Sequence, residues 1–213
     1  EQAYKLMAEL VLELRKQGHN IRHVDLGGGL GVPYRGTNDI PPHPSEYADM
    51  VKRTLGDLEC TLVMEPGRMI AGNAGILVTR VIYVKQGDGR NFVVTDAAMN
   101  DLIRPTLYDA FHELQPVKQP AADAAIITAD VVGPVCETGD YLAQQRDLPM
   151  VEAGDLIAVL TAGAYGAVQS GTYNTRPLVP EVLVHDERFA IVRPRQTYEQ
   201  LLGLDHLAEW QMG

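Results

Sequence analysis

The sequence predicts an α/β part followed by a β-rich part, and two observations support this division. Up to about residue 72, amphipathic helical segments alternate with short apolar strands, an order typical of a parallel α/β unit. Beyond that point, helical periodicity gives way to short strands bounded by turn residues. We therefore expect two domains, residues 1–72 and 73–213, the second an antiparallel β-barrel or sandwich with a closing helix.

The first part is expected to contain two helices and two strands. They are a helix over 3–17, a strand over 21–26, a helix over 46–55 and a strand over 60–65. Gly18 and Gly56 follow the helices as stop signals, and Ser45 is the expected cap of the second helix.

The second part is expected to consist mainly of antiparallel strands. They are predicted over 76–85, 91–95, 124–132, 156–160, 181–185 and 188–194, with a helix over 198–210 closing the chain. The first two strands flank Gln86-Gly87-Asp88-Gly89-Arg90, whose glycines indicate a hairpin.

Composition and charge exclude several classes of partner. The net charge of −10 argues against binding to nucleic acid or to an anionic membrane, because both would be repelled. No apolar run approaches the roughly 20 residues of a membrane span, and the first residues do not resemble a signal peptide, so the expected location is the cytoplasm. Cys60 and Cys136 lie in such different contexts that no disulfide is expected, and no metal site is predicted.

A glycine-dense stretch, Gly27-Gly28-Gly29-Leu30-Gly31, follows the first strand. Such glycines let backbone N–H groups approach an anion, which indicates a phosphate cup, and a tight turn that needs positive φ is an equally good interpretation. The spacing matches neither a dinucleotide fingerprint nor a Walker A loop, which leaves a smaller phosphate.

Glu65-Pro66-Gly67-Arg68 ends the next strand, and the carboxyl ends of parallel strands carry ligands. We therefore expect the glycine stretch and Glu65 to face one pocket. A carboxylate that closes an apolar strand calls for a cationic group, and an ion pair with Arg68 is one interpretation.

Arg104 and Tyr108 are four residues apart, which on a helix places a guanidinium and a phenol on one face. This pair suits a carboxylate ligand. An ordinary surface arginine is the alternative, and Pro105 weakens the argument for a helix.

Five motifs follow one another along the chain, namely His23–Gly31, Glu65–Arg68, Asn100–Tyr108, Cys136–Asp140 and Ala162–Gly166. In this order they resemble the motifs of the diaminopimelate decarboxylases, pyridoxal-phosphate enzymes with the alanine racemase-like fold. The resemblance covers the whole chain. It implies that the first part is the C-terminal portion of a TIM-type (β/α) barrel.

The resemblance also implies roles for individual residues. The cofactor would be pyridoxal 5′-phosphate, contacted by Gly27, Gly28, Gly29, Glu65, Gly67, Arg68 and Tyr165. Glu65 would meet the pyridine nitrogen, and the glycines would hold the phosphate with Tyr165 closing over it. The substrate would be meso-diaminopimelate, contacted by Arg68, Arg104, Tyr108, Glu137 and Tyr165. In this assignment the arginines and Tyr108 take the distal carboxylate, and Glu137 takes the distal ammonium.

Cys136 would be a proton donor supplied by the neighbouring subunit of a homodimer. The adjacent carboxylate of Glu137 would help to keep the thiol protonated, whereas Cys60, in an apolar strand, is expected to be a small core residue.

A pyridoxal-phosphate enzyme needs a lysine for its Schiff base. The five lysines are Lys5, Lys16, Lys52, Lys85 and Lys118, and none closes a buried strand facing the glycine stretch. The resemblance implies that this lysine lies upstream of Glu1, so the chain by itself is expected to be inactive. The expected reaction of the whole enzyme is conversion of meso-diaminopimelate to L-lysine and CO2. Two alternatives stay open, a related decarboxylase for ornithine or arginine and a non-catalytic dimerising or regulatory fragment.

Overall fold

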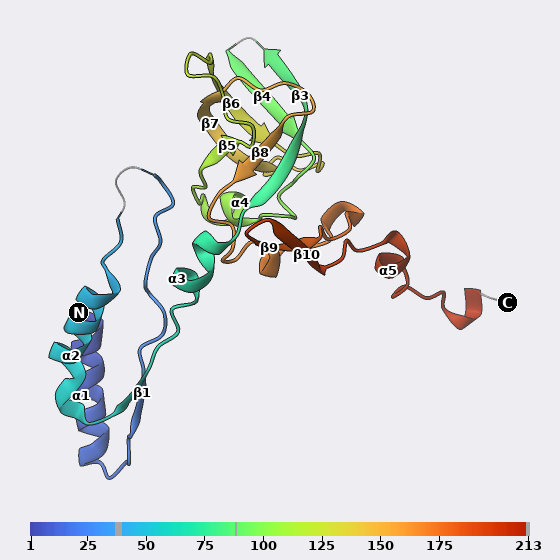
Figure 1. The fold of residues 1–213 in the computed structure, drawn as a ribbon. Coiled ribbons are helices and arrows are strands. Elements are labelled where there is room, and N and C mark those ends of the chain that lie inside the picture. The colour runs from blue at the N-terminus through green and yellow to red at the C-terminus, as the bar shows by residue number, and fades with distance from the viewer. Residues whose placement is uncertain (37–39, 88, 212–213) are drawn as a thin grey trace. The chain divides into compact units, whose positions relative to one another are not determined.

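A computed structural model of the chain describes residues 1–36, 40–87 and 89–211. Contacts within the chain divide it into two units, Glu1–Gly75 and Ile76–Gly213 (Figure 1). The boundary expected from the sequence, between 72 and 73, lies a few residues before this division.

The first unit contains two helices, α1 (Gln2–Lys16) and α2 (Pro44–Leu55), and two short strands, β1 (His23–Asp25) and β2 (Thr61–Val63). The strands pair in parallel, as the order of helices and strands predicts, and Val24 lies opposite Leu62. Apolar faces of both helices pack with the strands around a core of Val11, Val24, Leu26, Val51, Leu55 and Leu58. In the described part of this unit these two strands form the whole sheet, so no closed barrel is present.

The start of α2 differs from the sequence-based expectation. The cap is His43 and not Ser45, since the His43 Nδ1 accepts a hydrogen bond from the Ser45 backbone N–H at 3.3 Å. Pro44 explains the shift because proline has a preset helical φ and lacks an N–H, which suits it to the first position of a helix. After α2, the 3-10 turn η1 (Gly56–Leu58) leads to β2, and α3 (Gly67–Ala71) and η2 (Gly72–Ala74) end the unit.

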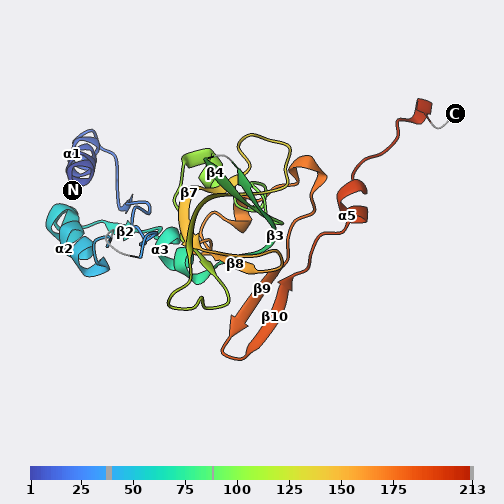
Figure 2. The same cartoon turned by 90° about the horizontal axis from the view of Figure 1, so that it is seen from above.

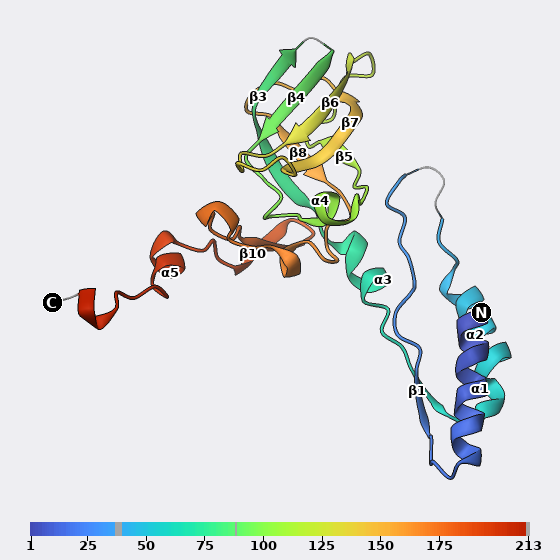
Figure 3. The same cartoon turned by 180° about the vertical axis from the view of Figure 1, so that it is seen from behind.

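The second unit is built on a six-stranded sheet in the order β5-β8-β3-β4-β6-β7. The strands are β3 (Leu77–Gly87), β4 (Arg90–Thr95), β5 (Leu114–Pro116), β6 (Ile126–Val132), β7 (Tyr141–Pro149) and β8 (Leu156–Val159). The two edge strands, β5 and β7, contact each other, so the sheet curls into a nearly closed barrel (Figure 3). A separate antiparallel hairpin, β9 (Glu181–His185) and β10 (Arg188–Arg193), lies outside the curled sheet (Figure 2).

Most expected strands are present, with corrections. The β3–β4 hairpin is antiparallel as expected, although Asp88 of its turn lies outside the described residues. The expectation of antiparallel pairing is wrong for β4 and β6, which pair in parallel, and the strands β5 and β7 were not expected. The closing helix is shorter than 198–210, because α5 (Tyr198–Leu202) ends at Gly203 and only the 3-10 turn η5 (Glu209–Gln211) follows. No helix in the described ranges is long and apolar enough to cross a membrane.

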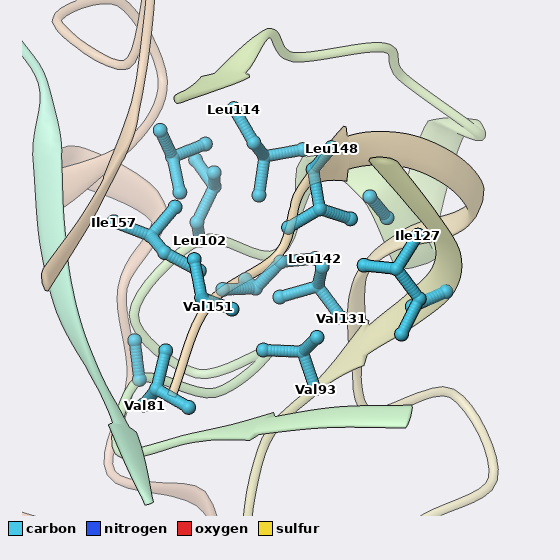
Figure 4. Close-up of a cluster of buried hydrophobic side chains, with 14 of the residues drawn as sticks. Val81, Val93, Leu102, Leu114, Ile127, Val131, Leu142, Leu148, Val151 and Ile157 are labelled. Carbon is cyan, nitrogen blue, oxygen red and sulfur yellow. The ribbon is translucent and has the colours of Figure 1, made fainter. Parts of the chain in front are cut away.

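The core of the second unit positions the loops at one end of its sheet. Figure 4 shows this cluster, in which Leu102, Leu142 and Ile157 are at most 1% exposed. Leu102 lies just before the short helix α4 (Arg104–Tyr108), and Leu142 follows the turn that contains Cys136. Because each loop leaves from a close-packed residue, its backbone starts from a fixed point.

Candidate active site

In the first unit, hydrogen bonds continue the β1–β2 pairing into the glycine stretch. The Leu26 N–H donates to the Val63 carbonyl at 2.9 Å, and the Glu65 N–H donates to the Gly27 carbonyl at 2.8 Å. The glycine stretch and the segment starting at Glu65 therefore lie side by side at the carboxyl ends of two parallel strands, where α/β folds carry their ligands.

Each glycine of the triplet is required by the local geometry. Gly27 and Gly29 have φ of +64° and +85°, values that side chains disfavour. A Cβ on Gly28 would lie 2.7 Å from the Glu65 carbonyl oxygen, which leaves no room for one. The tight-turn interpretation thus accounts for Gly27 and Gly29, whereas Gly28 is needed for the close approach of the two motifs. A backbone of this shape, free of side chains, also suits a small anion such as phosphate.

Glu65 is exposed, while its backbone is held on both sides. Besides the bond to Gly27, its carbonyl accepts a hydrogen bond from the Gly67 N–H at 2.7 Å, at the start of α3. Arg68 donates from Nη1 to the Tyr34 hydroxyl at 2.9 Å, and its guanidinium carbon lies 5.8 Å from the centre of that ring. Because its backbone is fixed, the Glu65 carboxylate extends from a defined position toward any cationic group that binds beside it.

In the second unit, α4 places Arg104 and Tyr108 one helical turn apart, as the spacing predicts. Pro105 does not break this helix because it lies in the first turn, where proline is tolerated. The two side chains differ in environment, since Arg104 is 6% exposed and Tyr108 is 61% exposed. A buried guanidinium is unusual, and Arg104 Nη1 lies 2.9 Å from His112 Nε2.

The turn that carries Cys136 and Glu137 is fixed by the buried carboxylate of Asp140. Its two oxygens accept hydrogen bonds from the Met99 and Val135 N–H groups, each at 2.6 Å. Burial raises the pKa of Asp140, and these two bonds act against that rise. Cys136 itself is exposed, so a thiol that solvent and ligands can reach stands on a rigid turn.

This turn packs against α4. The Thr106 hydroxyl donates to the Gly139 carbonyl at 2.5 Å, and a Cβ on Gly139 would lie 2.7 Å from Thr106 Cγ2. The Glu137 carboxylate accepts a hydrogen bond from the Tyr173 hydroxyl at 3.3 Å, and its charge raises the pKa of Tyr173. Arg104, Tyr108, Cys136 and Glu137 thus come from two segments that contact each other.

Tyr165 lies on a loop that joins the same end of the second unit. It has φ of +61° and is 41% exposed. Its neighbour Gly166 approaches the core closely, since a Cβ there would lie 2.3 Å from the Ala162 carbonyl oxygen and 3.7 Å from Leu102 Cδ1. The Asn100 side-chain amide also donates to the Gly171 carbonyl at 3.0 Å, which ties this loop to the segment before α4.

Sequence reasoning missed the residues that hold these segments together. They are Thr106, His112, Asp140 and Tyr173, and each makes a hydrogen bond to a residue at least eight positions away along the chain. Thr106 and Asp140 lie within motifs quoted above, but no role was expected for them, and His112 and Tyr173 lie outside those motifs. A helical or strand period does not report such contacts, because they depend on the tertiary fold.

All five lysines belong to the described residues, and all are exposed. None therefore lies in a buried position suited to a Schiff base, in keeping with the sequence-based expectation. In the described part of the chain, no group of three or more His, Cys, Asp or Glu side chains is arranged to hold a metal ion.

Comparisons with known proteins place these features in a family context. Residues 10–163 match the family model described as "Pyridoxal-dependent decarboxylase, C-terminal sheet domain". The chain is 46% identical over 210 residues to a diaminopimelate decarboxylase of Zymomonas mobilis, covering 99% of this chain and 49% of that protein. It is 50% identical over 205 residues to a diaminopimelate decarboxylase of Pseudomonas aeruginosa, covering 96% and 48%.

Among solved structures, the chain is similar to diaminopimelate decarboxylase from Helicobacter pylori complexed with L-lysine. The TM-score is 0.86 at 37% sequence identity, and the match covers 95% of this chain and 49% of that one. The chain thus spans about half the length of the relatives that it matches.

Proposed function

The chain belongs to the pyridoxal-dependent decarboxylases, and from this premise we propose that the complete protein converts meso-diaminopimelate to L-lysine and CO2. The relatives described above support this reaction, because both curated proteins are diaminopimelate decarboxylases and the H. pylori enzyme binds L-lysine. When bound, pyridoxal phosphate would supply the electron sink that accepts the electron pair left by departing CO2.

The first unit would supply the groups that hold the cofactor. Gly27, Gly28, Gly29 and Gly67 would line the phosphate site, because a backbone without side chains can approach an anion closely. The Gly27 and Gly67 N–H groups already donate to the Asp25 carboxylate and the Glu65 carbonyl, so the N–H donors to the phosphate would come from Gly28 and Gly29. The carboxylate of Glu65 would meet the pyridine nitrogen and hold a proton there. We propose that Arg68 and, from the second unit, Tyr165 also contact cofactor and substrate.

The buried Arg104 is the observation that carries the choice of substrate. A guanidinium that has been removed from water is suited to a carboxylate, which meso-diaminopimelate has at its distal end and ornithine and arginine lack. Tyr108 on the same helix would add a hydrogen bond to this carboxylate, and Glu137 would take the distal ammonium. Cys136 would deliver a proton, from the neighbouring subunit of a homodimer.

Substrate preference tests this proposal directly. We expect the complete protein, with pyridoxal phosphate, to have a kcat/KM for meso-diaminopimelate at least about 1000-fold above that for L-ornithine or L-arginine, since a site built for a charged group strongly rejects ligands that lack it. Release of CO2 and formation of L-lysine are the measured quantities. Comparable turnover of ornithine or arginine would favour the related decarboxylases, and no turnover of any of the three would favour a non-catalytic role.

A Gly28→Ala substitution tests the proposed phosphate site. Its Cβ would meet the Glu65 carbonyl oxygen at 2.7 Å, so the two motifs must move apart. We expect the complete protein to bind pyridoxal phosphate about tenfold more weakly, the result of a packing cost of roughly 1–3 kcal/mol, as measured by equilibrium dialysis.

Gly56→Ala is the matched control for this experiment. Gly56 is in the same unit and has φ of −58°, and a Cβ there would meet no atom within 4 Å beyond its chain neighbours and the adjacent helix backbone. Its affinity for pyridoxal phosphate should equal that of the unsubstituted protein. Equal affinity in the Gly28 variant would show that the glycine stretch does not hold the cofactor.

A further inference from the structure

His112 is a fully buried side chain, at 0% exposure, in the loop between α4 and β5. Both of its ring nitrogens are engaged. Nε2 lies 2.9 Å from Arg104 Nη1, and Nδ1 lies 2.9 Å from the Leu160 carbonyl oxygen, just after β8. The ring therefore bridges α4 to the segment that leads into the Tyr165 loop.

The chemistry of its partners fixes the protonation state of this ring. A guanidinium only donates hydrogen bonds and a carbonyl only accepts them, so Nε2 must accept from Arg104 while Nδ1–H donates to Leu160. Burial, together with the charges of Arg104 and Arg146, lowers the pKa of His112, and the bond to Leu160 opposes that shift. A neutral ring is the one form that serves both partners, because an imidazolium would point an N–H at the guanidinium.

The surroundings of the ring leave it little freedom to move. Arg146 of β7 donates from Nη1 to the His112 backbone carbonyl at 2.8 Å, and its guanidinium carbon lies 3.7 Å from the centre of the Phe111 ring. The residue is thus held by its backbone and by both ring nitrogens. A side chain held in this way can in turn hold its neighbour.

We infer that His112 is a positioning residue that orients the guanidinium of Arg104 toward the distal carboxylate of the substrate. The inference rests on the proposed function, which assigns that carboxylate to Arg104. The mechanism is local: the neutral imidazole accepts one N–H of Arg104, fixes the plane of the guanidinium, and is itself aligned by the Leu160 carbonyl.

Two substitutions of equal length separate this role from simple packing. His112→Gln keeps an oxygen acceptor near the position of Nε2, whereas His112→Met fills a similar volume without a strong acceptor. The two ligands to compare on the complete, cofactor-loaded protein are L-lysine and 1,5-diaminopentane. L-lysine retains the carboxylate assigned to Arg104, and 1,5-diaminopentane has the same carbon chain and ammonium groups without it.

We expect calorimetry to show L-lysine binding about tenfold more weakly to His112→Met than to His112→Gln, the size of a lost charge-assisted hydrogen bond. The dissociation constant of 1,5-diaminopentane should differ by less than about twofold between the variants. Equal weakening of both ligands, or no change in either, would overturn the inference.

The folding of each variant is checked by its thermal unfolding. If the Met variant does not fold, the Gln variant decides: an L-lysine affinity within about threefold of the unsubstituted protein supports the role, and a selective loss of about tenfold contradicts it. Failure of the proposed function is a separate result, because it would be seen as no CO2 release from meso-diaminopimelate by the unsubstituted protein, while the binding comparison would still decide the role of His112.

Discussion

Replacing Glu65 by glutamine in the complete protein is expected to lower kcat for meso-diaminopimelate by about 100-fold, the lower end of what a positioned proton-holding group contributes. A carboxylate opposite the pyridine nitrogen keeps that nitrogen protonated, and a protonated ring is the stronger electron sink. The amide of glutamine has nearly the same shape but no charge. Cofactor affinity should change little, because the glycine stretch and the Glu65 backbone are unaffected by the substitution.

The measurements for this variant are kcat and the dissociation constant of pyridoxal phosphate. Glu59→Gln is the matched control, because Glu59 is an exposed glutamate just before β2, and Glu65 follows the same strand at its other end. That control should keep its kcat. An unchanged kcat for Glu65→Gln would remove the assigned role, and a loss of cofactor binding as large as the loss of kcat would make Glu65 a binding group instead.

Much of the first unit could be predicted from its sequence because its information is local. The apolar stretches around β1 and β2 and the glycine stops after α1 and α2 reflect short-range rules, and the structure has all four elements. The side-by-side placement of Gly28 and Glu65 also follows from a general property of parallel strands. The cap of α2 was wrong by two residues because two capping rules competed, and the proline rule applied.

The second unit was harder to predict because its sheet departs from simple alternation. In β7 the polar run Gln144–Asp147 masks the strand, Gln145 has φ of +46°, and the pairing with β6 shifts register between Ala129 and Val131. Such an irregularity breaks the period of two on which strand prediction depends. The parallel pairing of β4 and β6 requires a connection that passes through α4 and β5, and no local pattern specifies its return.

The candidate site shows the same division between local and long-range information. The motifs around Arg104, Cys136 and Tyr165 can be found along the chain, because each is a short run of residues that resembles a family motif, and the spacing of Arg104 and Tyr108 also predicts that they share a helical face. The residues that hold those motifs in place cannot be identified from the sequence alone. The His112 side chain bonds a carbonyl 48 positions away along the chain, and the Asp140 carboxylate bonds an N–H 41 positions away. At such sequence separations, only the folded structure shows which residues are paired.

Cys136→Ala is expected to lower kcat of the complete protein by about 100-fold, since a general acid contributes at least this much, while KM changes by less than about threefold. The thiol would donate a proton after CO2 departs and would not bind the substrate. Asp140 holds the turn through the Met99 and Val135 N–H groups, so removing the Cys136 side chain should leave the turn intact. Steady-state formation of L-lysine measures both constants.

Cys60→Ala is the control for this loss because Cys60 is the only other cysteine of the chain. It is partly buried and accepts a hydrogen bond from Arg15 at 3.1 Å, so its substitution should affect stability and leave kcat unchanged. A rise in KM of Cys136→Ala as large as its loss of kcat would instead mark Cys136 as part of the binding surface.

Mixing the two impaired variants, Cys136→Ala and Glu65→Gln, tests whether Cys136 acts across a dimer. If each site combines Glu65 of one subunit with Cys136 of the other, a mixed dimer of Cys136→Ala and Glu65→Gln contains one site with both residues intact. Random reassociation of equal amounts makes half of the dimers mixed, so the sample should regain about a quarter of the unsubstituted activity. If both residues serve the site of their own subunit, every site in the mixture keeps one substitution, and the activity stays at the level of the separate variants.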